Sequence, residues 1–190
     1  MKLLPLCCLA VPLILAGCNM SSHTPSAGYA MQYEPATVAA GTVNLTTRIL
    51  EVEKNSDTRW QTLLPGWEPK KVVTTVDTQK LKTALSLAKH IGINGITMST
   101  TPDGIPVPLA IETQSPGETT GYHFVFTPTA NSADASIALR MNMDIKDPKG
   151  NFNMDQKIVI PHGQSLLVAR ALSKDKLEIV IVTPQAATGV

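Results

Sequence analysis

The sequence predicts an α+β domain in which a mostly antiparallel β-sheet dominates and one amphipathic helix is inserted early. Over most of the chain, short runs of alternating apolar and polar residues are separated by clusters of Pro, Gly, Asn and Asp. Only one stretch, between Asp77 and Gly92, places its apolar residues at helical spacing. Many short strands with a single helix fit a layered domain built around a sheet.

The first strand is predicted at VNLTTRILEVE, residues 43 to 53. Its apolar residues alternate as far as Ile49 and then change phase at Leu50, which indicates a bulge or bend within one long strand. A loop that contains Trp60 and Trp67 follows. These two side chains either cap the core or contact a partner, and capping is favoured because a buried tryptophan adds a large contact area to a modest core.

A short strand at residues 72 to 76 leads into the one predicted helix, at about residues 77 to 91. Asp77 is a candidate N-cap, and the apolar residues after it recur on one helical face. Gly92 is a natural stop at the C-terminal end. The residues on the apolar face are Leu81, Ala84, Leu85 and Ala88.

Extended segments follow the helix. The strand INGITMST is interrupted by Gly95, and the turn TPDG connects it to IPVPLAIET. The prolines confine this latter segment to a sheet edge, because proline cannot donate a hydrogen bond to a neighbouring strand. After the turn SPGETTG, strands are predicted at YHFVFTPTA, ASIALRMNMDI and QKIVI, with KDPKGN as the turn before the last of them.

The last predicted element is a hairpin, LLVARALSKDKLEIVIVTP, from Leu166 to Pro184. Its strands are apolar on both faces around Arg170, and SKDK joins them. Strands of about seven residues are shorter than the roughly nine to eleven residues of a tilted transmembrane strand, and neither alternates like the wall of a pore. We therefore expect a buried hairpin of a water-soluble domain.

The amino terminus has the pattern of a bacterial lipoprotein leader. Lys2 precedes an apolar run from Leu3 to Leu15, and the motif LAGC ends at Cys18. This predicts a signal peptide at residues 1 to 17 rather than a membrane span. The motif resembles the lipoprotein box, which implies lipid attachment at Cys18 and membrane binding through that lipid. The alternative is an ordinary signal peptide that is cut nearby.

The leader also contains Cys7 and Cys8, so the mature chain keeps only Cys18 and no disulfide is expected. Asn19 follows the cysteine. By resemblance to enteric lipoproteins, in which an aspartate at this position signals retention in the inner membrane, the outer membrane is favoured. The domain would then face the periplasm.

Residues 18 to 42 are rich in Ser, Thr, Pro, Gly and Ala without any period, which predicts a flexible tether. The folded domain is then expected at residues 43 to 185, and residues 186 to 190 are expected to form a frayed tail. Alternatively, part of the tether forms a short strand on the sheet edge of a partner. The alternating residues in that part are Tyr29, Met31 and Tyr33.

Composition argues against several function classes. A net charge of +1, scattered basic residues and an aromatic content of 4% leave neither a basic stripe nor a stacking surface, so no nucleic-acid partner is expected. No Gly-x-Ser-x-Gly motif and no phosphate-binding glycine loop is present. No pair of histidines has the spacing of metal ligands. From these absences together we expect no enzyme activity, no cofactor and no metal site. The histidines are His23, His90, His123 and His162.

Four carboxylates are interpreted as turn formers and strand ends, with a weak possibility of metal binding. They are Asp134, Asp144, Asp147 and Asp155. Ser165 lies close to His162 in the sequence, but their spacing within a hairpin turn does not favour a catalytic pair.

The succession of these elements resembles the carboxy-terminal domain of the secretins, the outer-membrane channel subunits of type II and III secretion and of type IV pili. The similarity covers about residues 43 to 184 and consists of short pieces. These include Glu51 after an Ile/Leu-rich run, the Thr127-Pro128 pair, the Gly163-Gln164 turn and a closing strand that ends in Thr183 and Pro184.

Secretins carry a long insertion before the closing strand, where this chain has only SKDK. The resemblance therefore implies a reduced secretin-like domain without the membrane insertion. Such a lipoprotein would be a structural or accessory component of an envelope secretion, pilus or conjugation assembly, binding envelope proteins or oligomerising with itself. The alternative is a stand-alone envelope lipoprotein that binds another partner through a sheet edge or through Trp60 and Trp67. An envelope hydrolase is the least favoured function.

Overall fold

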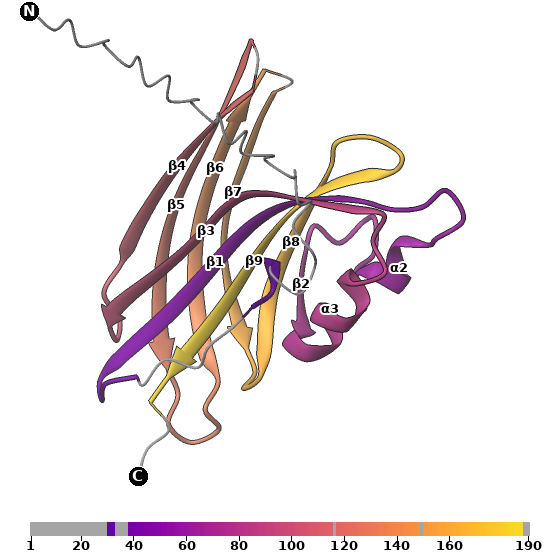
Figure 1. Ribbon diagram of the computed structural model, residues 1–190. Coiled ribbons are helices and arrows are strands. Elements are labelled where there is room, and N and C mark those ends of the chain that lie inside the picture. The colour runs from indigo at the N-terminus through magenta and orange to yellow at the C-terminus, as the bar shows by residue number, and fades with distance from the viewer. Residues whose placement is uncertain (1–29, 33–37, 116, 149, 188–190) are drawn as a thin grey trace, which may run out of the picture.

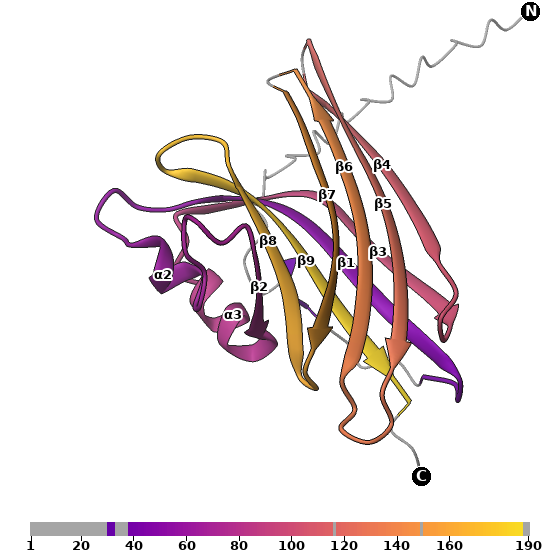
Figure 2. The ribbon, with the colours of Figure 1, turned by 180° about the vertical axis from the view of Figure 1, so that it is seen from behind.

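The computed structural model describes residues 30 to 32, 38 to 115, 117 to 148 and 150 to 187. In this part of the chain two antiparallel sheets face each other, and two short helices lie against the outer face of one of them (Figures 1 and 2). The α+β prediction with mostly antiparallel strands is confirmed at this level. The division of the strands between two sheets was not predicted.

The larger sheet has five strands in the order β2-β8-β9-β1-β3, and every pair is antiparallel. The order depends on long-range pairing, because β9 near the end of the chain lies between β8 and the first strand. The five strands are β1 (Thr42–Glu53), β2 (Val73–Asp77), β3 (His90–Pro102), β8 (Gln164–Ala171) and β9 (Lys176–Ala186).

The smaller sheet is a meander of four strands, in which each strand pairs with the next one in sequence. The strand that contains Pro108 is at its edge, as the prolines predict. The predicted turn ahead of this strand is also present, with Gly104 at a φ of 75°. The four strands are β4 (Val107–Ser115), β5 (Glu118–Ala130), β6 (Ile137–Asp147) and β7 (Gly150–Ile160).

Two apolar cores hold these layers together. The inner core lies between the two sheets and includes alternate residues of β5 and β6. The outer core lies between the larger sheet and the helices α2 (Trp60–Leu63) and α3 (Thr78–Leu85). Because the larger sheet has a core on each face at β8 and β9, this hairpin is apolar on both faces, as expected: Val180 belongs to the inner core and Ile179 to the outer core.

The phase change in β1 has the same cause. Ile49 belongs to the inner core and Leu50 to the outer core, and the pairing of β1 with β9 continues without a break through both residues. A register shift does occur here, but on the other side of β1. Ile49 is opposite Gly95 and Leu50 is opposite Ile93, so Asn94 of β3 is the extra residue.

The helix prediction is correct at its start and wrong at its end. The Asp77 side chain caps α3 by accepting a hydrogen bond from the backbone N–H of Lys80 at 2.8 Å. However, α3 ends at Leu85 instead of near residue 91, because the following residues join the larger sheet. Lys89 donates its backbone N–H to the carbonyl of Glu53, and β3 begins one residue later.

One element and part of another were not predicted. The four-residue helix α2 occupies part of the tryptophan loop. β7 begins at Gly150, so the predicted strand QKIVI is only the second half of an eleven-residue strand, whose first two residues were assigned to the turn KDPKGN. Its sequence is polar because β7 is an edge strand, with Phe152 and Met154 only half-buried toward the inner core.

The chain packs against the outer core before the predicted domain start at residue 43. Ala30 is fully buried there, Met31 is 2% exposed, and the carbonyl of Gln32 accepts a hydrogen bond from Arg48 Nη2 at 2.9 Å. The tether prediction therefore does not hold at residues 30 to 32. At the other end, β9 continues to Ala186, one residue beyond the predicted boundary.

Candidate functional site

The predicted lipid attachment site, Cys18, lies outside the described residues, as do the signal peptide, Tyr29 and Tyr33. Among the described residues, no helix has the length and apolar character to cross a bilayer.

Of the histidines and carboxylates singled out in the sequence, His123 and Asp144 are opposite each other on β5 and β6, and His23 lies outside the described residues. His90, His123 and His162 lie on β3, on β5 and in the turn before β8. Within the described ranges, no three His, Cys, Asp or Glu residues are arranged to hold a metal ion. Ser165 Oγ is hydrogen-bonded to the hydroxyls of Thr78 and Thr183, each at 2.8 Å.

The four aspartates have separate structural roles. Asp134 is a turn former as predicted, because its side chain accepts the backbone N–H of Ser136, and hydrogen bonds from Ser136 lower the pKa of this carboxyl group. Asp144 and Asp155, in contrast, lie within β6 and β7 rather than in loops or at strand ends. Asp147 ends β6 and forms an ion pair with Arg170.

The two tryptophans meet at one corner of the outer core. Trp67 is 6% exposed and belongs to the outer core, whereas Trp60 is half-buried and packs edge-on against it with ring centroids 6.5 Å apart. Trp60 Nε1 donates to the carbonyl of Lys174 at 3.4 Å. The corner thus joins the loop after β1 to the turn between β8 and β9, and only Trp60 presents a tryptophan edge to the surface.

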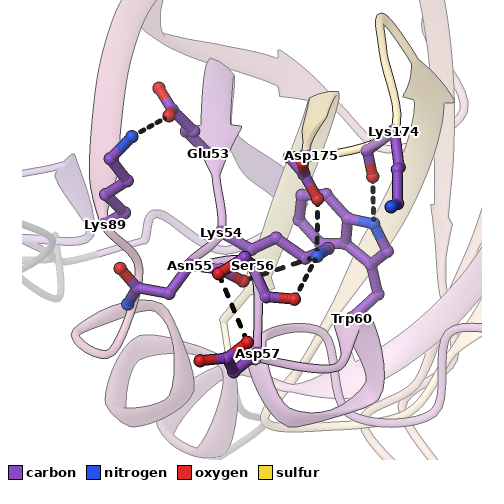
Figure 3. A network of polar contacts seen from close by, with 9 residues as sticks. All are labelled: Glu53, Lys54, Asn55, Ser56, Asp57, Trp60, Lys89, Lys174 and Asp175. Carbon is purple, nitrogen blue, oxygen red and sulfur yellow. Dashed lines mark hydrogen bonds and ion pairs between the residues drawn. The ribbon is translucent and has the colours of Figure 1, made fainter.

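A buried lysine completes this corner (Figure 3). Lys54 Nζ lies 2.6 Å from a carboxylate oxygen of Asp175 and 6.0 Å from the centre of the Trp60 ring. It also donates to the carbonyls of Asn55 and Ser56, each at 3.4 Å. The hydrogen bond from Lys54 lowers the pKa of Asp175. The lysine charge is satisfied by the protein, so this corner is ordered by its own contacts.

A polar network lies at one end of the space between the two sheets, which we call the mouth. Arg170 donates to Glu178 Oε1 from Nε at 3.1 Å and from Nη2 at 3.0 Å, and it also donates to Asp147 from Nη1. The other oxygen of Glu178 accepts from the Tyr122 hydroxyl at 2.7 Å, and Asn94 donates to that hydroxyl at 3.4 Å. The network therefore links β8 and β9 of the larger sheet to β5 and β6 of the smaller sheet.

This network shifts two pKa values. Burial first, and then the charge of Glu178, raises the pKa of Tyr122 well above its usual range. Burial alone would lower the pKa of Arg170, but Glu178 and Asp147 outweigh it and raise that pKa. Arg170 and Asp147 of this network were singled out from the sequence, but not Glu178, which bonds to Arg170 through two nitrogens. Glu178 could have been found from the hairpin register, because Arg170 and Glu178 are directly opposite across the turn.

The small pocket beside the network has a volume of about 240 Å³. The Arg170 guanidinium at its wall already binds two carboxylates, so the pocket offers no free cation to a ligand. Its lining residues are Asp147, Gly150, Asn151, Phe152, Arg170, Ala171 and Leu172.

The outer edge of β3 is the surface with the clearest capacity to bind a partner. β3 ends the larger sheet, and four of its residues are exposed. We call Ile96, Met98 and Thr100 the open edge; the fourth is Pro102. The backbone N–H of Asp103 donates to the carbonyl of Gly41 on the β1 side at 2.9 Å. Backbone polar groups alternate in direction along an antiparallel strand, so those of the even-numbered open-edge residues point away from β1 and toward the surface.

Comparison of the chain with protein-family models, with curated proteins and with solved structures found no match.

Proposed function

We propose that this chain is a lipid-anchored structural or accessory component of an envelope secretion, pilus or conjugation assembly, and that its domain is a reduced relative of the secretin carboxy-terminal domain. The observation that carries the proposal is the open edge of β3. A long strand edge with outward backbone groups is a general means of joining one protein to another.

The order of the elements supports the secretin relationship. A long first strand, a helix, a strand that leads into a proline-bearing edge strand and a closing hairpin follow one another as the resemblance implies. The closing strand β9 is inserted beside β1, so the ends of the domain are paired with each other. The short turn between β8 and β9 leaves the hairpin as part of the core.

The distance from the expected anchor to the folded domain supports attachment close to a membrane. Ala30, the first residue that the structure describes, is buried in the outer core and comes twelve residues after Cys18. Twelve residues span at most about 40 Å when fully extended. A lipid on Cys18 would therefore hold the domain within about one domain diameter of the outer membrane, with the domain facing the periplasm.

Fractionation of cells that express the full chain tests the anchor. We expect the wild-type protein in the outer-membrane fraction and the Cys18→Ala variant in the soluble periplasmic fraction, with the same thermal unfolding midpoint. A Cys18→Ala variant that stays in the membrane would contradict lipid attachment.

Cross-linking in intact cells tests the assembly role. Residues of the open edge, replaced one at a time by a photo-reactive amino acid, should cross-link to a subunit of a secretion, pilus or conjugation system. Val159 on β7, which is 59% exposed, provides the control position. Equal cross-linking from Val159, or adducts with unrelated proteins alone, would refute the proposal.

The Trp60 corner favours a second candidate function, that of a stand-alone envelope lipoprotein that binds another partner. Trp60 is the half-buried member of the tryptophan pair and lies beside Lys174 at the surface. In that case Trp60→Ala would abolish partner capture while the domain remains folded, whereas changes at the open edge would leave capture intact.

A further inference from the structure

The four sheet edges of the described chain are not equally protected against pairing with another strand. β2 is only five residues long, and β4 contains Pro108, which cannot donate to a neighbouring strand. β7 carries Asp155 and Lys157, whose charges oppose the burial of its edge. Each of these three edges has one of the features that proteins use to prevent edge pairing.

β3 has none of these protections over most of its length. Residues 91 to 101, IGINGITMSTT, contain no charged residue and no proline. Ile96 is 41% exposed and Met98 is 65% exposed, so the free edge is bordered by apolar side chains. An exposed, long and apolar edge of this kind is a site for strand addition.

We propose that the open edge pairs in antiparallel orientation with the same edge of a second copy of this chain, so that the two larger sheets become continuous. This inference rests on the proposed function, because it treats the domain as an assembly module, and it names the partner. Antiparallel pairing of identical strands is self-complementary about a two-fold axis.

The alternation of β3 places even-numbered residues opposite even-numbered residues in this pairing, and the register centred on Thr97 pairs the two exposed apolar residues with each other. Residues opposite each other in an antiparallel pair lie on the same face. With Thr97 on the two-fold axis, Ile96 is opposite Met98 of the partner subunit, and Met98 is opposite the partner subunit's Ile96. Both of these residues have outward backbone groups, so each such pair exchanges two hydrogen bonds, and four apolar side chains gather on one face.

Charge also favours a second copy in this orientation. The uncharged centre of β3 brings no like charges together. Beyond it, Lys89 at one end is paired with Glu53 of its own subunit, and the exposed Asp103 follows the other end. Antiparallel pairing keeps the two Asp103 side chains at opposite ends of the paired strands, whereas parallel pairing would place them together.

The mass of the mature full-length protein, purified in detergent and corrected for bound detergent by multi-angle light scattering, tests this pairing. We expect a dimer. The double variant Ile96→Lys/Met98→Lys should raise the dimer dissociation constant by about a hundredfold or more, because each pairing would bring four lysines together. Val159→Lys on the edge of β7 should leave the dimer intact.

A second variant tests backbone pairing directly. Met98→Pro removes an N–H that points away from β1, so the bonds between β1 and β3 are kept while the dimer is weakened. Circular dichroism verifies that each variant is folded. A monomeric wild type, an oligomer larger than two, or a dimer that survives both open-edge variants would overturn the inference.

The two proposals can fail separately. A monomeric wild type that is still anchored through Cys18 and still cross-links to an assembly subunit would overturn only the dimer. A dimer whose open-edge positions cross-link to the second copy, but which yields no adduct with an assembly subunit from any exposed position, would overturn only the assembly role.

Discussion

The inner and outer cores of this domain end in different ways. The inner core ends at the mouth between the sheets in the polar network around Arg170 and Glu178, which joins one sheet to the other. The outer core ends in the apolar contacts of Trp67 and Met31 and in the ion pair of Lys54 with Asp175, which joins a loop to a turn. Hydrogen bonds and ion pairs require particular directions, so we infer that the network fixes the angle between the two sheets. Apolar contacts adapt more readily, which suits a layer made of two short helices and residues 30 to 32.

Ile179 and Glu178 are neighbours on β9 whose side chains point to opposite faces of the sheet, so substitutions at these two positions test the outer core and the polar network separately. Ile179 is fully buried in the outer core, and we expect Ile179→Ala to lower the free energy of unfolding by about 4 kcal/mol, through lost apolar contact and the cavity left behind. Urea unfolding followed by tryptophan fluorescence measures this, since both tryptophans lie at the outer core. The exposed Val159 provides a control, because Val159→Ala should change stability by no more than about 0.5 kcal/mol. Equal effects of the two substitutions would contradict the burial of Ile179.

Glu178 points to the other face and is expected to have the next largest effect. Glu178→Ala leaves Arg170 with Asp147 as its carboxylate partner and removes the acceptor of Tyr122. We expect a loss of about 3 kcal/mol, the lower end for breaking a buried ion pair, because one carboxylate remains. Urea unfolding monitored by circular dichroism reports on both sheets. Glu178→Gln, which keeps an acceptor but not the charge, should lose less; equal losses would mean that the charge contributes nothing.

The sequence was most informative where one physical demand acted alone. The Asp77 cap, the turn at Gly104 and the edge position of Pro108 each follow from local backbone chemistry, and all three are confirmed. The end of α3 could not be predicted in this way, because pairing of residues 90 to 93 with β1 overrides a helical pattern that continues past Leu85. The polar first half of β7 was missed since an edge strand needs few apolar residues.

The candidate surfaces were harder to predict than the elements. Trp60 and Trp67 were singled out, but only the fold reveals that Trp67 is buried and that Lys54 completes the corner. The open edge was not predicted, because whether INGITMST lies inside a sheet or at its edge depends on the distant strand β9. Edges are a property of strand order, and in this domain strand order is set by residues more than a hundred positions apart.

The approach of the two sheets at Gly95 offers a smaller test of how rigid the inner core is. A Cβ atom at this position would lie 3.0 Å from Ile111 Cδ1 of β4. We expect Gly95→Ala to cost about 1 kcal/mol in the free energy of unfolding, through overpacking. Adding Ile111→Val removes the clashing methyl group, so the double variant should regain part of the loss in a double-mutant cycle. Strict additivity would indicate that the sheets separate freely at this point.

The contribution of Tyr122 to the free energy of unfolding depends on pH, and this dependence gives a further test of the polar network at the end of the inner core. Burial, and then the charge of Glu178, raises the pKa of Tyr122 in the folded state above its ordinary value of 10.0. Near pH 10 the unfolded chain therefore releases this proton while the folded chain retains it. The contribution is fully present below pH 10 and is lost progressively as the pH rises above that value.

Urea midpoints of the wild type and Tyr122→Phe, measured between pH 8 and pH 11, separate this titration from that of the lysines, which both proteins share. We expect the midpoint of the wild type to fall more steeply above pH 10 than that of Tyr122→Phe, which starts lower at pH 8 because it lacks the hydrogen bond to Glu178. Parallel curves would mean that burial and Glu178 do not raise the pKa of the Tyr122 phenol. The inner core would then end in water at its mouth, and the contrast with the outer core would reduce to the Arg170 ion pairs alone.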